Sequence, residues 1–260
     1  MKLELAGKNA VICASSSGLG YACAEALMAA GANIVINGRS TKRLEEAKAR
    51  LKALRSDGPV KAVAADITTA EGVAHLVASA GNIDILVNNN AGPTPGDFLS
   101  FTEEDWVEAI RANMIAPLML IRQVLPGMKE RNFGRIVNIT SAMVTAPRPH
   151  MTLSAAARTG LTAACKAISR QYAPYNITIN NLLPERFDTP RQQQMAQIAM
   201  QQKGISFDQA RAEQIGSIPA GRMGQPYEFG AACVFLCSDM AGYISGQNLH
   251  LDGAAYPGLV

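Results

Sequence analysis

Short runs of apolar, often β-branched residues recur along the chain, separated by longer segments with a helical repeat. Most of these runs are apolar almost throughout rather than alternating, which is typical of strands buried on both faces of a parallel sheet. The predicted strands are NAVIC (9–13), NIVIN (33–37), VKAVAAD (60–66), IDILVN (83–88), GRIVNIT (134–140), NITINNLL (176–183) and QNLHL (247–251).

The intervening segments are predicted helices. Thr102, followed by Glu104 and Asp105, provides a cap and favourable charges at one helix start. Repeated strand–helix–strand order implies right-handed crossovers, so we expect an α/β fold with a doubly wound, Rossmann-like parallel sheet and helices on both faces. The predicted helices cover residues 21–31, 41–54, 70–80, 102–130, 154–173 and 226–239.

One segment, at about residues 186–220, breaks this alternation. It is rich in Gln and Met and follows the sixth predicted strand, a place suited to a mobile helical lid over a pocket. Because the chain has no internal repeat and no linker, we expect residues 1–260 to form a single domain that includes this lid.

Composition narrows the choice of partners. The chain has 260 residues, a net charge of +3 and no basic stripe with interleaved aromatics, so we expect no nucleic-acid partner. The start MKLELAGK lacks the apolar run of a signal peptide, and no segment has the apolar length that spans a bilayer. The five cysteines include no CxxC pair, and Cys233 and Cys237 fit packed core thiols. We therefore expect a cytoplasmic protein without membrane association.

The first candidate chemistry follows the first predicted strand. CASSSGLG (13–20) joins this strand to a helix, with Gly18 and Gly20 placed where a diphosphate would approach backbone N–H groups. Two glycines alone are a weak signal, but Arg39-Ser40 ends the second strand, where a dinucleotide fold meets the adenosine ribose. An arginine there suits a 2′-phosphate, so the sequence predicts NADP(H) rather than NAD(H).

Further motifs follow in a specific order along essentially the whole chain. They are Asp66, Asn89-Asn90-Ala91-Gly92, Asn113, IVNITS ending at Ser141, Pro184, Arg222-Met223-Gly224-Gln225-Pro226 and YISGQNLHLDG (243–253). Together these motifs resemble the short-chain dehydrogenase/reductase family, in which 3-oxoacyl-ACP reductases are the commonest analogues of such a sequence.

The resemblance implies an oxidoreductase that acts on a small carbonyl or alcohol substrate, uses no metal and assembles as a homotetramer or homodimer. It implies that Asp66 contacts adenine, that Asn113 holds a water in a proton relay and that Ser141 binds the substrate carbonyl. The cofactor-binding residues that it implies are Ala14, Ser15, Ser16, Ser17, Gly18, Leu19, Gly20, Arg39, Ser40, Asp66, Ile67, Asn90, Ala91, Gly92, Arg158, Pro184, Glu185 and Phe187.

The chain departs from the family pattern at two loops. Cys13-Ala14 stands where Thr-Gly is usual, and Ala14 fits a tight turn only if its backbone angles stay ordinary. Pro184-Glu185 stands where Pro-Gly is usual. The Glu185 carboxylate would repel an acidic substrate, hydrogen-bond a polar one, or face solvent.

The largest departure is in the catalytic pair. The family has a Tyr thirteen residues after the catalytic Ser and a Lys four residues later, and these positions are Ser154 and Arg158 here. Serine is a far weaker acid than a phenol with a pKa of about 10. Arg158 keeps a positive charge that can hold ribose hydroxyls. A water held by Ser154, Ser141 and Asn113 would replace the missing acid, and His150 is the alternative.

Three functions stay open. The first is an NADP(H)-dependent oxidoreductase with a modified proton relay, favoured by the retained nucleotide motifs, Asn113 and Ser141. The second is a nucleotide-binding protein without catalysis, a pseudoenzyme or sensor, which the missing Tyr fits directly. The third is a non-redox enzyme on the same scaffold. Halohydrin dehalogenases carry Arg in place of the Lys, but they keep the Tyr and lose the nucleotide loop, the reverse of this chain.

Overall fold

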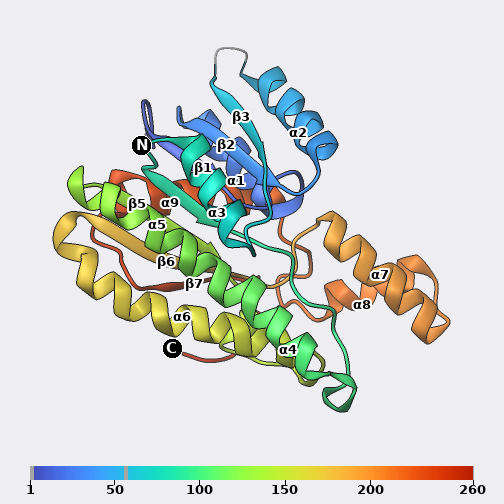
Figure 1. Cartoon of the computed structure of the whole chain (residues 1–260). Helices are drawn as coiled ribbons and strands as arrows, with labels where there is room; N and C mark the ends of the chain where they lie inside the picture. The colour runs from blue at the N-terminus through green and yellow to red at the C-terminus, as the bar shows by residue number, and fades with distance from the viewer. Residues whose placement is uncertain (1–2, 56–57, 260) are drawn as a thin grey trace.

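A computed structural model describes residues 3–55 and 58–259. Seven parallel strands form one sheet in the order β3-β2-β1-β4-β5-β6-β7, with helices on both faces (Figure 1). The predicted fold class is therefore confirmed. The strand order reverses between β1 and β4, and in such sheets ligands bind at the carboxyl ends of the strands beside this reversal.

All seven predicted strands are present, with ends that differ from the prediction by no more than two residues. They are β1 (Asn9–Ile12), β2 (Asn33–Gly38), β3 (Val60–Ala64), β4 (Ile85–Asn88), β5 (Gly134–Ile139), β6 (Ile177–Pro184) and β7 (Asn248–Leu251). The α-helices are α1 (Gly18–Ala29), α2 (Thr41–Leu54), α3 (Ala70–Ala80), α4 (Glu103–Ile110), α5 (Ala116–Glu130), α6 (Thr152–Tyr172), α7 (Pro190–Lys203), α8 (Phe207–Gly216) and α9 (Pro226–Cys237).

Each face of the sheet has its own apolar core. Residues of α1, α2 and α9 pack in one cluster with one set of strand side chains, and residues of α3, α5 and α6 pack in the other. Cys233 and Cys237 lie fully buried in the first cluster, as predicted. Because both faces are covered, the central strands are buried along nearly their whole length, which explains their continuous apolar runs.

Four asparagines form a ladder of hydrogen bonds across β4, β5, β6 and β7. Asn88, Asn138, Asn181 and Asn248 are register partners on neighbouring strands. Each side-chain Nδ2 donates to the Oδ1 of the next asparagine, at 2.9, 2.9 and 2.8 Å. Since a buried amide without partners is costly, the ladder lets polar side chains occupy an otherwise apolar core. The Oδ1 of Asn88, at the start of the ladder, has no partner among the described residues.

The predicted helix at 102–130 is divided. Thr102 caps α4 in a reciprocal pair with Asp105, and a π-helical segment at Arg111–Ile115 then separates α4 from α5. Such wide turns are frequent at functional sites, and this one contains Asn113. α1 also begins three residues before the predicted start, at Gly18. Backbone irregularities of this kind depend on tertiary contacts and leave no periodic signal in the sequence.

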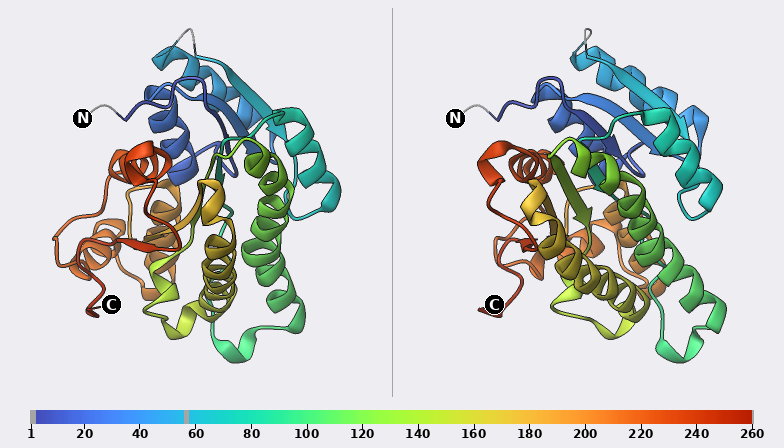
Figure 2. Two further views of the ribbon diagram at one scale, coloured as in Figure 1. Left: turned by 90° about the vertical axis from the view of Figure 1, so that its left-hand side faces the viewer. Right: turned by 60° about the vertical axis from the view of Figure 1, so that its left-hand side comes forward.

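The segment at 186–220 contains α7 and α8, which project from the body of the molecule beyond the sheet (Figures 1 and 2). Ser206 and Gln209 form a reciprocal cap at the start of α8. Within the described residues, no helix is long and apolar enough to cross a membrane, and no group of three or more His, Cys, Asp or Glu side chains is placed to hold a metal.

Candidate active site

The loop between β1 and α1 is fixed from its buried side. The Ser15 hydroxyl donates to the Ile12 carbonyl at 2.7 Å and accepts from the Asn37 N–H at 3.1 Å. A Cβ at Gly20 would lie 2.6 Å from the Ala14 carbonyl oxygen, whereas a Cβ at Gly18 would meet nothing within 4 Å. α1 begins at Gly18, and the Ser17 side chain makes no capping hydrogen bond. The first N–H groups of α1 are thus suited to an anion.

Ala14 does not have the ordinary backbone angles that were expected. Its φ is +44°, in the left-handed region that costs a non-glycine residue about 1 kcal/mol. Asn89 holds this peptide, because its Nδ2 donates to the Ala14 carbonyl at 3.1 Å. The loop therefore keeps a glycine-like backbone despite the alanine, and surrounding contacts offset the strain.

The residues predicted for the adenosine end lie at the carboxyl ends of β2 and β3. Arg39 is exposed directly after β2. Asp66 Oδ1 accepts from the N–H and hydroxyl of Thr68, at 2.9 and 2.7 Å. These hydrogen bonds lower the pKa of the Asp66 carboxyl, and the Arg39 charge adds a smaller effect in the same direction. Ser40 serves as the cap of α2, since its hydroxyl accepts from the Arg43 N–H at 3.4 Å.

Arg158 is a buried cation on α6. Its Nη1 donates to the Ile139 carbonyl at 2.8 Å and its Nη2 to the Asn90 carbonyl at 3.4 Å. The guanidinium therefore joins the end of β5 to the segment that follows β4. Burial lowers its pKa to about 10, so it stays charged at neutral pH. Ser154 lies one helical turn earlier and is also buried, so both residues face inward as their spacing predicts.

A small cavity of about 10 Å³ lies beside this guanidinium, and Asn88, Asn113 and Arg158 all line it. Asn113 Nδ2 donates to the Ala109 carbonyl at 3.4 Å, but its Oδ1 has no partner among the described residues, as is also true of Asn88 Oδ1. A cavity of this size is near the minimum that holds one water, and a buried water needs two to four polar partners. Two amide oxygens and a guanidinium meet that requirement.

The loop between β5 and α6 carries Ser141. Its Oγ accepts from the Met143 N–H at 3.2 Å, which leaves the hydroxyl proton available to another acceptor. His150, the alternative acid, is exposed in a short 3-10 turn, and its backbone carbonyl accepts from the Gly96 N–H at 3.0 Å. His250 of β7 also lies beside this loop, with its Nε2 3.2 Å from the Thr145 hydroxyl.

Glu185 is not the solvent-facing carboxylate that one interpretation of the sequence allowed. Its side chain is only 5% exposed, and Arg148 Nη2 donates to its Oε1 at 2.7 Å. Arg186 Nε lies 3.6 Å from the same oxygen. The carboxylate is therefore neutralised within the protein. Sequence reasoning missed Arg148, because nothing local in the PRPH loop indicates which acidic group it meets.

Phe187 lies in the core, with its ring 5.2 Å from that of Phe229 and beside Gly224. The segments around it are tied to the two projecting helices. Arg191 of α7 donates to the Pro93 carbonyl at 3.4 Å, and Arg211 of α8 pairs with Asp188 at 2.8 Å. The first of these links places α7 near the segment after Asn90-Ala91-Gly92.

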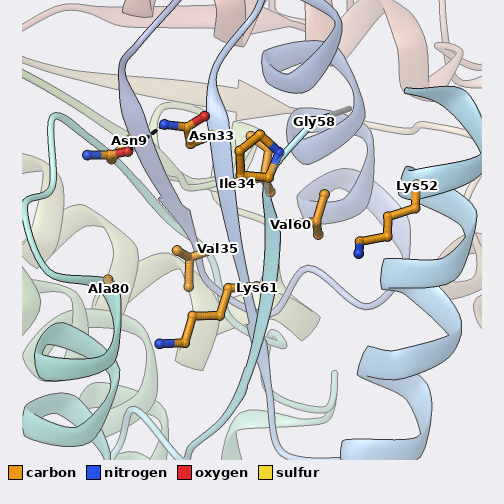
Figure 3. Close-up of a pocket in the computed structure, with 10 residues that line it drawn as sticks. Asn9, Asn33, Ile34, Val35, Lys52, Gly58, Val60, Lys61 and Ala80 are labelled. Atoms are coloured by element: carbon orange, nitrogen blue, oxygen red, sulfur yellow. Dashed lines mark hydrogen bonds between the residues drawn. The ribbon is translucent and has the colours of Figure 1, made fainter. Parts of the chain in front are cut away.

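A larger cavity, of about 450 Å³, lies at the opposite end of the sheet (Figure 3). It is bordered by the first residues of β1, β2 and β3 and by Lys52 and Lys61. The Lys61 ammonium donates to the Ser79 carbonyl at 2.7 Å. None of the predicted site residues lies there, and the candidate chemistry gathers at the carboxyl ends of the strands instead.

Known proteins with similar sequences and structures identify the family to which this chain belongs. A family profile described as enoyl-(acyl carrier protein) reductase matches residues 13–254. The chain belongs to the short-chain dehydrogenase/reductase family. Among its relatives, the 3-oxoacyl-[acyl-carrier-protein] reductase FabG of Vibrio harveyi is 33% identical, with 98% of this chain and 99% of that protein covered. The NADPH-dependent reductase BacG of Bacillus subtilis is 31% identical over 95% of this chain and 97% of that one.

A solved structure of similar shape is L-sorbose reductase from Gluconobacter frateurii, complexed with NADPH and L-sorbose. It superposes with a TM-score of 0.95 at 30% identity, with the whole of both chains covered. Ser154 and Arg158 of α6 occupy the two positions at which the sequence-based resemblance predicts Tyr and Lys.

Proposed function

We propose that this protein is an oxidoreductase that transfers a hydride between NADP(H) and a carbonyl or alcohol substrate, with a modified proton relay. Relatives named as NADPH-dependent reductases and the NADPH complex of a similar structure support the cofactor. The open approach at Gly18 and the uncapped start of α1 fit a diphosphate, and exposed Arg39 fits a 2′-phosphate. When bound, the cofactor supplies or accepts the hydride.

In this proposal the chain positions the substrate and moves a proton. The Ser141 hydroxyl, free to donate, binds the substrate carbonyl oxygen and polarises it. Asp66, Ile67, Asn90, Ala91 and Gly92 surround the adenosine half of the cofactor, whereas Arg158, Pro184, Glu185 and the backbone of Phe187 lie toward its nicotinamide half.

The observation that carries the proposal is the cavity shared by Arg158 and the unpartnered Asn113 oxygen. A water there donates to Asn113 Oδ1 and accepts from Arg158, and Ser154 connects it to the substrate oxygen. Because Arg158 remains a cation, it stabilises negative charge on this water as the water gives up a proton. The relay thus uses water where other members of the family use a Tyr.

A nucleotide-binding protein without catalysis is the second candidate, favoured by Ser154 itself, since a serine hydroxyl is too weak an acid to replace a phenol. Absorbance of NADPH, followed with a panel of aldehydes and ketones, separates the two. Substrate-dependent loss of absorbance supports the oxidoreductase, whereas NADPH binding without turnover supports the second candidate. Halide release without nucleotide would instead support a non-redox enzyme.

We further propose that the chain works as one domain in which the segment at 186–220 acts as a lid. The hydrogen bond from Arg191 of α7 to the Pro93 carbonyl supports this role, because it connects the lid to the segment that follows Asn90-Ala91-Gly92. We propose a cytoplasmic homotetramer or homodimer, consistent with five free cysteines. Size-exclusion chromatography with light scattering tests the assembly.

A further inference from the structure

Glu185 is paired with two arginines. This residue follows β6 at the carboxyl edge of the sheet, and two guanidiniums, those of Arg148 and Arg186, share its Oε1. One carboxylate cannot neutralise both. Burial lowers the pKa of Arg186, the Glu185 carboxylate opposes this effect, and the nearby Arg148 charge adds a smaller lowering.

The two arginines differ in what else they bind. Arg186 Nη1 donates to the Gln214 carbonyl at 2.6 Å and also to the Ser217 hydroxyl, which directly follows α8. The Arg186 guanidinium therefore binds the end of that helix. Arg148 is 36% exposed at its side chain and uses only Nη2. Its Nε and Nη1 donate to no described residue. Arg148 therefore presents free donors, oriented by Glu185.

Arg148 lies among the segments that border Ser141. It is in the loop between Ser141 and Ser154, two residues before His150, whose carbonyl accepts from Gly96 at 3.0 Å. That contact brings the loop against residues 93–97, to which Arg191 of α7 is also tied through Pro93. The free guanidinium edge of Arg148 is therefore carried by a loop that joins Ser141 to the segments beside α7.

We propose that Arg148 binds the carboxylate of an anionic substrate, a short 2-oxo or 3-oxo acid, and that Glu185 is a positioning residue for it. A guanidinium matches a carboxylate with two parallel N–H donors, and the net positive charge draws an anion to the site. This inference rests on the proposed function, because it assumes that Ser141 binds the reacting carbonyl. It reverses one of the three sequence-based alternatives, that Glu185 would repel an acidic substrate.

Matched acids and esters test the inference. The rate of NADPH oxidation is measured with pyruvate and acetoacetate and with their methyl esters, which keep the carbonyl but lack the charge. We expect kcat/KM to be at least about tenfold higher for one or both acids than for the matching ester. R148Q should remove this preference by raising KM for the acids, and R148K should retain part of it. R170Q, at an exposed arginine in the last turn of α6, should behave as the wild-type protein.

Equilibrium binding separates failure of this inference from failure of the proposed function. Calorimetric titration of the protein saturated with NADP⁺ should give a dissociation constant for an acid at least about tenfold below that of its ester, with the difference lost in R148Q. If the acid binds in this way but NADPH is not oxidised, the proposed function is overturned and the carboxylate-binding site is still supported. The inference is overturned if acid and ester bind equally or if neither binds. It is also overturned if R148Q keeps the preference for the acid.

Discussion

Replacement of Arg158 by methionine tests whether the buried guanidinium serves function rather than folding. Burial lowers its pKa from the ordinary value of 12.5 to about 10. Since a tenfold change in an equilibrium is worth about 1.4 kcal/mol, keeping this cation in the core costs the folded state about 3 kcal/mol. The cost is present at every pH below about 10, because there the charged form is the one that must be buried. Methionine removes this cost, because its unbranched side chain is apolar and carries no charge.

The same substitution removes the hydrogen bonds to the Ile139 and Asn90 carbonyls, which costs about 1–3 kcal/mol because one of these oxygens lies in the core. The two effects nearly cancel. We therefore expect urea denaturation to give a free energy of unfolding within about 2 kcal/mol of the wild-type value. NADPH affinity and NADPH-dependent turnover should each fall at least about tenfold, since the charged hydrogen-bond donor that we propose for the cofactor and the relay is lost.

Leu161→Ala is the matched control, because Leu161 is buried and lines the same cavity. It should cost about 2–5 kcal/mol of stability, the range for a buried leucine. If R158M destabilises the protein as much as this control, the guanidinium is structural and the reasoning fails. It fails equally if R158M binds NADPH and turns over substrate like the wild-type protein.

Three further changes have outcomes that follow from single contacts. Arg39→Ala should weaken NADPH binding, measured by calorimetry, at least about tenfold and leave NADH binding unchanged. An equal loss of affinity for both nucleotides would show that Arg39 does not bind the 2′-phosphate. Ala14→Gly should raise stability by up to about 1 kcal/mol in thermal unfolding, because φ is +44°, and a loss would contradict the strain. Asn181→Ala should cost about 1–3 kcal/mol in urea, since Asn138 Nδ2 loses the acceptor Oδ1 in the core; no loss would mean that the ladder contributes nothing.

The strands were predictable because burial on both faces leaves a continuous apolar run, which needs no knowledge of neighbours. The positions of the loop at 13–20 and of Arg39 at the carboxyl ends of strands were predictable for a similar reason, since both follow a strand directly. The π-helical segment at Asn113 was not, because it depends on packing between α4, α5 and α6.

Partners distant in sequence were also missed. The sequence shows Asn88, Asn138, Asn181 and Asn248, but only the strand register reveals that they form one ladder. The environment of Glu185 likewise depends on Arg148, thirty-seven residues away. Local patterns predict elements well, whereas the protonation state and orientation of a site residue are determined by contacts that topology creates.

The most direct test of the central claim is the substrate-dependent loss of NADPH absorbance, measured for the wild-type protein beside Ser141→Ala. We predict that an oxo compound from the acid and ester panel is reduced by the wild-type protein and that S141A loses at least about a hundredfold of that rate, as expected when a donor to the reacting oxygen is removed. If the wild-type protein binds NADPH but oxidises it no faster than S141A does, the account is contradicted. The protein would then be a nucleotide-binding protein without catalysis.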